Sequence, residues 1–284
     1  MHEPKQPLAE VFGFLTSDLS PQATRYRTNR LCPFNNKVPN CTKDKAAHPL
    51  GVCSIYNADE PVITCPIRFR EDWQVADDAA AFFFPSGTTW TSLIDVRLND
   101  GYDKHVATID VVLVAYDEKG KVFDFGALGI QAVYTTGNAR AFFDSYMQSP
   151  TDYAEMGWLS GPDYPQPDYL WSWQTILAPR FSGMAGIFKG WQKRTAVAIN
   201  KAFFTRMPSM PTVEKAEADI AWLVYDLQLH NEGGAPRYRL TKVDEVYTRF
   251  ALPHWCTTVA MPDDISRLMR ALNAELYLQG DNFQ

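Results

Sequence analysis

Apolar and polar residues in the middle of the chain follow patterns that are typical of strands. Residues 91–98 alternate, residues 105–117 are rich in β-branched side chains, and residues 122–134 form a third apolar run. The turn sequence DEKGK separates the second run from the third, so these two predict a hairpin. Residues 218–229 predict a further buried strand.

Two other segments have helical patterns. Residues 138–148 suit a helix in which Asn138 is the N-cap. Residues 262–279 place Pro262 in the first turn and acidic residues directly after it. The apolar stripe of this second helix consists of Ile265, Leu268, Leu272 and Leu276.

The remaining segments are less regular. Residues 185–207 mix helical and strand patterns, and residues 1–70 are rich in loops, with cysteine, asparagine and proline. The order of loops, strands, helix, strand and helix predicts one α/β domain that carries an N-terminal metal-bound element.

Composition limits the class of protein. The chain has 284 residues, of which 46% are hydrophobic and 13% aromatic, so it can build a large core. A formal net charge of −6 does not indicate a nucleic-acid partner, although a local basic patch could still bind one. No apolar run is long enough for a signal peptide or a membrane span, so we expect a cytoplasmic protein without membrane contact.

Four of the five cysteines are clustered. They fall within 34 residues, and the fifth, Cys256, is far away. Such a cluster in a reducing compartment favours a metal site with a structural role, because four thiolates leave no open position for water. Zinc and iron both suit this soft ligand set, and four unrelated buried cysteines are the alternative. The four are Cys32, Cys41, Cys53 and Cys65.

Acidic and amide side chains interrupt three apolar strands. Asp95 and Asp110 each stand within one strand, and Gln131 follows Gly129 by two positions in the next. A buried acid costs several kcal/mol unless it is paired or bound to a metal. Two acids on adjacent strands therefore suggest a Mg²⁺ site of the kind that nucleases use, and a surface-facing Asp110 is the alternative.

Several motifs together resemble one family. They are LAEVFG…DLSP, the cysteine cluster with CPF, GVC and CP-x-R, and a strand pair that ends in IQ…TTGN. The chain resembles the NotI-type restriction endonucleases, a branch of the PD-(D/E)xK nucleases, over most of its length. This resemblance implies a PD-(D/E)xK core at residues 76–284 and an N-terminal, DNA-contacting region at residues 1–75 whose four cysteines hold one structural iron.

The resemblance also implies site residues and partners. The catalytic Asp of the family falls on Asp110, its Gln on Gln131, an upstream acid on Asp95, and the catalytic Glu on Gly129. Members of the family use Mg²⁺, act as homodimers on palindromic, GC-rich duplex DNA, and have a cognate methyltransferase in the host.

Gly129 departs from the family at a metal ligand. We expect a strongly impaired nuclease, because glycine provides no carboxylate. The chain is then either a Glu-to-Gly variant of an active enzyme or a naturally degenerate relative. The competing interpretation is a DNA-binding protein that is stabilised by a structural metal ion and has no catalytic activity. A hydrolase that uses His254 and Cys256 is a weaker alternative, because these residues are more often part of a core.

Basic residues are unevenly distributed. Residues 169–213 and 19–43 contain no Asp or Glu, so either stretch could neutralise DNA phosphates, and a solvated basic surface is the alternative. The weak DNA-binding candidates in these stretches are Arg25, Arg27, Arg30, Lys189, Lys193 and Arg194.

Overall fold

The structure is a computed structural model of the 284-residue chain. It describes residues 6–35, 38–45, 47–99, 105–154, 157–158, 161–231, 235–250 and 265–281.

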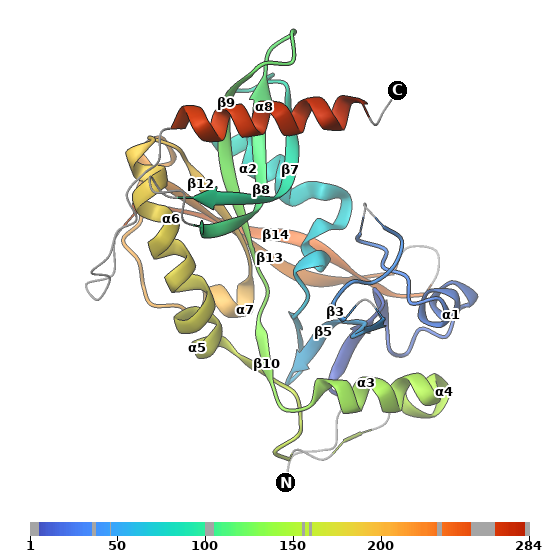
Figure 1. The fold of residues 1–284 in the computed structure, drawn as a ribbon. Coiled ribbons are helices and arrows are strands. Elements are labelled where there is room, and N and C mark those ends of the chain that lie inside the picture. The colour runs from blue at the N-terminus through green and yellow to red at the C-terminus, as the bar shows by residue number, and fades with distance from the viewer. Residues whose placement is uncertain are drawn as a thin grey trace.

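A six-stranded mixed sheet forms the centre of the molecule (Figure 1), and its strand order is β14-β13-β12-β9-β8-β7. Strand β12 pairs in parallel with both β9 and β13, and the other neighbours pair antiparallel. The strands are β7 (Trp90–Asn99), β8 (His105–Tyr116), β9 (Val122–Gln131), β12 (Thr195–Asn200), β13 (Ile220–His230) and β14 (Arg237–Thr248).

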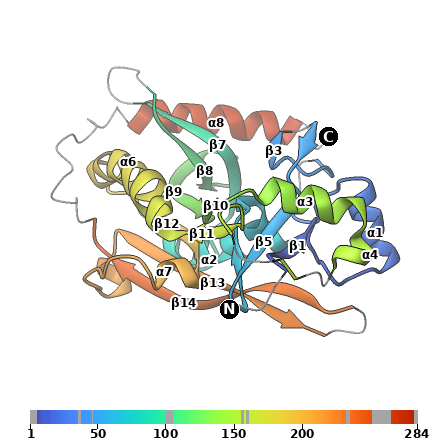
Figure 2. The same cartoon turned by 90° about the horizontal axis from the view of Figure 1, so that it is seen from below.

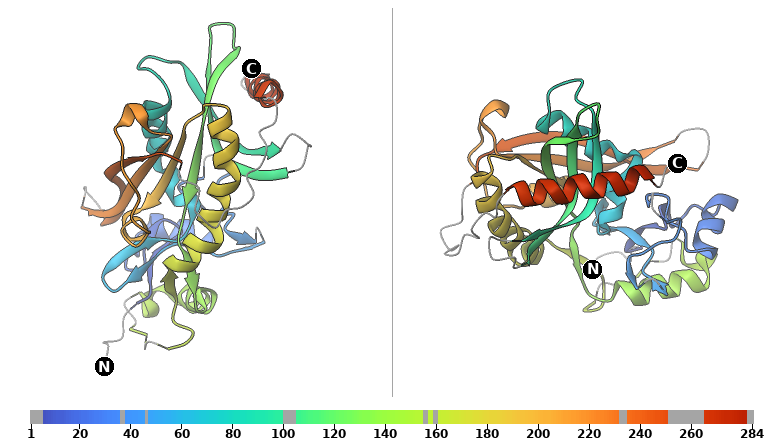
Figure 3. Two further views of the ribbon diagram at one scale, coloured as in Figure 1. Left: turned by 90° about the vertical axis from the view of Figure 1, so that its left-hand side faces the viewer. Right: turned by 45° about the horizontal axis from the view of Figure 1, so that its top comes forward.

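Helices cover both faces of this sheet. Helix α2 (Gln74–Phe83) packs through its alanine and phenylalanine side chains on one face. Helices α6 (Ala178–Gly190) and α8 (Ile265–Asp281) pack on the other face. Figure 3 shows α8 and α6 on one side of the strands and α2 on the opposite side. The predicted α/β class with a mixed sheet and flanking helices is therefore confirmed.

A second, smaller sheet is built from the N-terminal residues, with the strand order β2-β1-β5-β6. Its core includes Phe142, Phe143 and Tyr146 of helix α3 (Ala139–Gln148), which lie far along the chain. The predicted division of the chain at residue 75 stays a prediction. The core of the small sheet contains side chains from residues before and after this boundary. The strands are β1 (Leu8–Val11), β2 (Phe14–Leu15), β5 (Val52–Asn57) and β6 (Glu60–Ile63).

Short elements complete the fold, and Figure 2 shows α1 and α6 on opposite sides of the molecule. In the N-terminal half they are α1 (Pro21–Thr28), β3 (Asp44–Lys45), β4 (His48–Pro49) and the 3₁₀ helix η1 (Pro66–Trp73). In the C-terminal half they are β10 (Tyr134–Thr136), α4 (Pro150–Tyr153), β11 (Gln166–Asp168), α5 (Tyr169–Trp171), the π-helix η2 (Ser172–Leu177), α7 (Lys201–Phe204) and η3 (Lys215–Glu217).

Most patterned segments form the elements that their periodicity predicts. The hairpin of β8 and β9 turns at residues 117–121, and Asn138 caps α3 by accepting a hydrogen bond from the backbone N–H of Ala141. The stripe of α8 packs on the sheet. The ambiguous residues 185–207 contain the end of α6, β12 and α7. Pro262 lies outside the described residues, as do His254 and Cys256.

Within the described part of the chain, no helix is both long enough and apolar enough to cross a membrane.

Candidate active site

The strand register brings three of the four predicted catalytic positions into one row. Val111 pairs with Leu128, and continuing this antiparallel register by one residue places Asp110 opposite Gly129. On the other side of β8, Ile94 pairs with Val111 and Val96 with Ile109, which places Asp95 opposite Asp110. Facing residues of neighbouring strands lie close together, so the row runs across β7, β8 and β9.

Both carboxylate oxygens of Asp110 have partners. Oδ2 accepts a hydrogen bond of 2.7 Å from the backbone N–H of Ile130 on β9. Oδ1 lies 2.7 Å from Nη2 of Arg180 on α6. The side chains of Asp110 and Arg180 are 29% and 22% exposed, respectively, so this ion pair is accessible to solvent. Asp110 is therefore neither a buried acid nor a freely solvated one.

The space beside Gly129 is open. A Cβ atom added at Gly129 would meet only one atom within 4 Å, the backbone oxygen of Ala196 at 3.9 Å. The contrast is Gly126 on the same strand, where a Cβ atom would lie 2.4 Å from the ring of Phe83. Packing thus explains the glycine at 126 and does not explain the one at 129.

Gln131 ends strand β9, where it pairs with Ile199 of β12. Its side chain is buried, and its Nε2 donates a hydrogen bond of 2.6 Å to the backbone oxygen of Ala132. Residues two apart on a strand share a face, so Gln131 and position 129 lie on the same side of the sheet.

Asp95 lies at an irregular and exposed position of β7. It is exposed, and its φ of 59° is unusual for a residue with a side chain. This left-handed residue interrupts the alternation of β7, because Leu93 and Val96, on either side of it, are both buried. The structure therefore places Asp95 at an irregularity of β7 and not inside a regular apolar strand.

These residues do not fit a catalytic divalent cation as they stand. Of the carboxylates that the structure describes, Asp110 is the one beside position 129 with an oxygen bonded to β9, and Arg180 pairs with its other oxygen. Among the described residues, no group of three or more His, Cys, Asp or Glu side chains is disposed as a metal-binding set. We therefore derive no metal-dependent step for the chain with Gly129.

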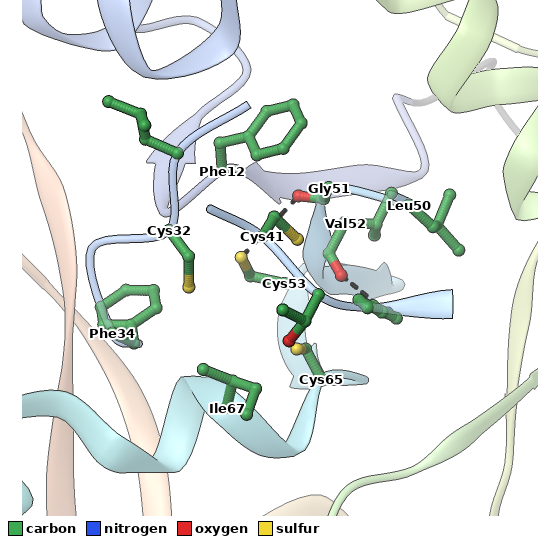
Figure 4. Close-up of a pocket in the computed structure, with 13 residues that line it drawn as sticks. Phe12, Cys32, Phe34, Cys41, Leu50, Gly51, Val52, Cys53, Cys65 and Ile67 are labelled. Carbon is green, nitrogen blue, oxygen red and sulfur yellow. Dashed lines mark hydrogen bonds between the residues drawn. The ribbon is translucent and has the colours of Figure 1, made fainter. Parts of the chain in front are cut away.

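The four clustered cysteines come together around one small cavity (Figure 4). Cys32 and Cys41 come from loops, Cys53 comes from β5, and Cys65 directly precedes η1. The sulfurs are turned toward a shared space of about 10 Å³, which is roughly the least space that holds one water molecule. The rest of the lining is mostly apolar and includes Phe12 and Phe34, together with the polar residues Thr42 and Lys43.

Burial disfavours the thiolate form at three of these four cysteines. Burial raises the pKa of Cys32 to about 11, and burial also raises the pKa values of Cys41 and Cys53. The cysteines are free thiols that line the cavity without the geometry of a ligand set. Their number, their softness and the single-atom scale of the cavity fit one metal ion, and the structure by itself does not show such a site.

The predicted DNA-binding residues fall into two groups. Arg27 is buried and donates hydrogen bonds of 2.6 Å to the backbone oxygens of Asp18 and Leu15, so its role here is structural. Lys193 forms an ion pair with Asp124, and Arg194 donates a hydrogen bond to the backbone oxygen of Phe82. These three basic side chains are thus held by contacts within the protein.

The other group is exposed. Arg25, Arg30 and Lys189 are exposed to solvent, although Arg30 donates a hydrogen bond of 3.0 Å to the backbone oxygen of Ala47. They do not form one patch, because α1 and α6 lie on opposite sides of the molecule (Figure 1, Figure 2).

Comparison with known protein families matches residues 15–240 to the family described as Restriction endonuclease NotI. The chain belongs to this family. The match spans most of the chain and includes both the cysteine cluster and the row of Asp95, Asp110 and Gly129. NotI family membership supports a type II restriction endonuclease, and therefore a site-specific nuclease with double-stranded DNA as its partner. A comparison with curated proteins gave no match.

Sequence reasoning missed one residue of the site. Arg180 belongs to the acid-free stretch at residues 169–213, but nothing in the pattern singles it out from the other basic residues there. Its contact with Asp110 depends on how α6 crosses the sheet.

Proposed function

We propose that this NotI-family chain is a type II restriction endonuclease with a PD-(D/E)xK core whose catalytic centre is silenced at Gly129. One observation carries the proposal. Gly129 directly follows Leu128, the last residue of β9 that pairs with β8, and the next residue, Ile130, donates its backbone N–H to Asp110. The Cβ atom of a glutamate at position 129 would contact no side chain within 4 Å.

The chemistry explains why the glycine silences the site. A divalent cation in a nuclease polarises the scissile phosphate and lowers the pKa of the attacking water, and it needs several oxygen ligands held together. Among the described residues, Asp110 is the one carboxylate beside position 129 that contacts β9, so the cation has too few ligands. The glycine is either a substitution in an active enzyme or the natural residue of a degenerate relative, and both give the same chemical defect.

A cleavage assay tests the proposal directly. We expect Gly129→Glu to cut GC-rich plasmid DNA into discrete fragments with Mg²⁺, and the chain with Gly129 to be slower by at least about 10² to 10³-fold, the effect that losing one stabiliser of transition-state charge has in other enzymes. Gly129→Gln is the matched control, because it adds nearly the same volume without the charge. Asp110→Asn in the Gly129→Glu background should remove the restored activity.

Three outcomes would contradict the assignment. Cleavage by the Gly129 chain itself would mean that other residues build the metal site. Equal cleavage by the Gln and Glu variants would show that the carboxylate is not what is missing. If Gly129→Glu does not cleave DNA but still binds it in a gel shift, the result would favour the competing interpretation, a DNA-binding protein that is stabilised by a structural metal ion and has no catalytic activity.

We propose separately that the four clustered cysteines bind one structural metal, iron or zinc. The support is the donor set, four thiols around one cavity of atomic size. Metal analysis of the purified protein should find about one iron or zinc per chain. Cys53→Ser should lower this content and the melting temperature, and Cys256→Ser, which alters the fifth cysteine, should leave both unchanged. A wild-type protein that folds without any metal would refute the proposal.

The wider context of the activity follows from the same family. We propose a homodimer that acts in the cytoplasm on a palindromic, GC-rich site and is accompanied by a methyltransferase that protects the host. Two-fold symmetry would present one catalytic centre to each half-site.

A further inference from the structure

Arg180 is fixed beside Asp110 by two anchors. Its Nη2 atom lies 2.7 Å from Oδ1 of Asp110 and donates a hydrogen bond of 3.0 Å to the backbone oxygen of Thr108. Both acceptors belong to strand β8. Helix α6, which carries Arg180, is itself held on the sheet by the buried side chains of Ile187 and Phe188. These contacts fix the position of the guanidinium group relative to strand β8.

The pair leaves part of the guanidinium available. The two contacts that Arg180 makes with described residues both run through Nη2, whereas a guanidinium carries five N–H donors. The Arg180 side chain is 22% exposed, so an incoming group can reach it. The planar guanidinium matches the geometry of a phosphate and forms stronger, charge-assisted hydrogen bonds with it.

The charge balance of the row is unusual for a nuclease. A centre with two carboxylates repels a DNA phosphate until a cation neutralises them. Here Gly129 removes one of the two negative charges, and Arg180 compensates the other, on Asp110. Asp95, the third position of the row, is an exposed acid. The pair of Arg180 and Asp110 joins one positive and one negative group, so it contributes no net charge.

We propose that Arg180 binds a DNA phosphate at this centre and allows the chain to bind duplex DNA without a divalent cation. The inference rests on the proposed function in one respect, that the ligand is duplex DNA. It is independent of whether the chain can be made to cut.

The test compares DNA affinity with and without a divalent cation at constant ionic strength. The probe is a fluorescent pool of short GC-rich duplexes, and binding is followed by fluorescence anisotropy in EDTA and in Ca²⁺, a hard cation that binds carboxylates. The full chain should bind equally well in both. Arg180→Met should lose about tenfold in affinity both in EDTA and in Ca²⁺, the loss expected for one hydrogen bond between charged groups.

Two control variants separate the site from general charge and from folding. Lys119→Met removes an exposed charge in the turn that follows β8 and should leave the affinity within about twofold, as expected for screened charges. Arg180→Lys keeps the charge and should retain most of the EDTA binding. Melting curves of all variants show whether a loss of affinity reflects unfolding.

The outcomes distinguish this inference from the proposed function. A folded Arg180→Met that binds as the wild type does in EDTA overturns the role of Arg180. A wild-type chain that binds only with Ca²⁺ overturns it as well. A wild-type chain that binds no duplex under any condition overturns the proposed function, and the inference with it.

Discussion

Two charged centres of the molecule have opposite accessibility. Around Arg68, the side chains of Arg68, Glu10 and Glu71 are 0%, 1% and 8% exposed. Around Asp110, the carboxylate and its partner Arg180 are 29% and 22% exposed. Both centres pair arginine with carboxylate at hydrogen-bonding distance. Burial therefore distinguishes a centre that joins parts of the fold from one that a ligand can reach.

The buried centre connects the two sheets. Arg68 of η1 lies 3.1 Å from Glu10 of β1 and 2.8 Å from Glu71, and it donates a hydrogen bond of 2.9 Å to the backbone oxygen of Tyr238 on β14. It also lies over the ring of Phe34, beside the cysteine cavity. Every contact is internal, so this centre holds the N-terminal sheet against the main sheet.

The charges at this junction reinforce one another. Burial lowers the pKa of Arg68, but Glu10 and Glu71 raise it by more, so the net pKa is raised. Burial raises the pKa of Glu71, but Arg68 and the hydrogen bonds that Glu71 accepts lower it by more, so the net pKa is below its usual value. Both groups are therefore charged in the folded protein at neutral pH.

The largest effect is expected from removing Arg68. Arg68→Met should lower the free energy of unfolding by about 3–5 kcal/mol, because it leaves buried carboxylates without a counter-charge. The matched control is Arg140→Met, which breaks an exposed pair with Asp44 and should cost no more than about 1 kcal/mol. Urea unfolding measures both. If the two variants lost similar stability, burial would not be what separates the two centres.

The second prediction compares the two glycines of β9. Gly126→Ala should destabilise the fold by about 1–3 kcal/mol, because the new methyl group meets the ring of Phe83. Gly129→Ala should be neutral or stabilising by up to about 1 kcal/mol, because alanine loses less conformational entropy than glycine in a strand. Thermal melting of both variants checks this. A large loss at 129 would show that the glycine there is structural, which would weaken the proposal that a catalytic carboxylate is missing.

The smallest effect concerns pH and Glu71. Because the folded-state pKa of Glu71 is lowered, its contribution to stability is complete above the unfolded value of about 4.3 and is lost as pH falls through the folded value. Wild-type stability should therefore fall more steeply with acidification below that pH than the stability of Glu71→Gln. Urea unfolding at a series of acidic pH values measures the difference. Parallel curves would mean that Glu71 is not held in its charged form by Arg68.

Much of the fold could be predicted from local patterns. The strands β7, β8, β9 and β13 and the helices α3 and α8 follow from alternation, β-branched runs, a cap and an apolar stripe. Strand β14 and helix α2 were missed. Strand β14 carries many charged residues because it is an edge strand, and the buried positions of α2 include small alanines that give a weak apolar signal.

The candidate site was only partly predictable. The positions of Asp110, Gly129 and Gln131 could be named, because spacing along a strand fixes which residues share a face. The structural role of Arg27 could not, because its acceptors are backbone oxygens brought near it by folding. The buried pairing of Arg68 with Glu10 joins residues 58 positions apart, and no local pattern reports it.

The chemical groups can be read directly from the residue order: four clustered thiols, an acid in strand β8, and a glycine two residues before a glutamine. Which charges stand next to one another depends on how distant segments pack. This packing sets Asp110 against Arg180 and encloses Arg68 between Glu10 and Glu71. The physical reason is that local periodicity reflects which face of an element is buried, whereas electrostatic energy depends on distances and burial that exist only after distant segments pack together.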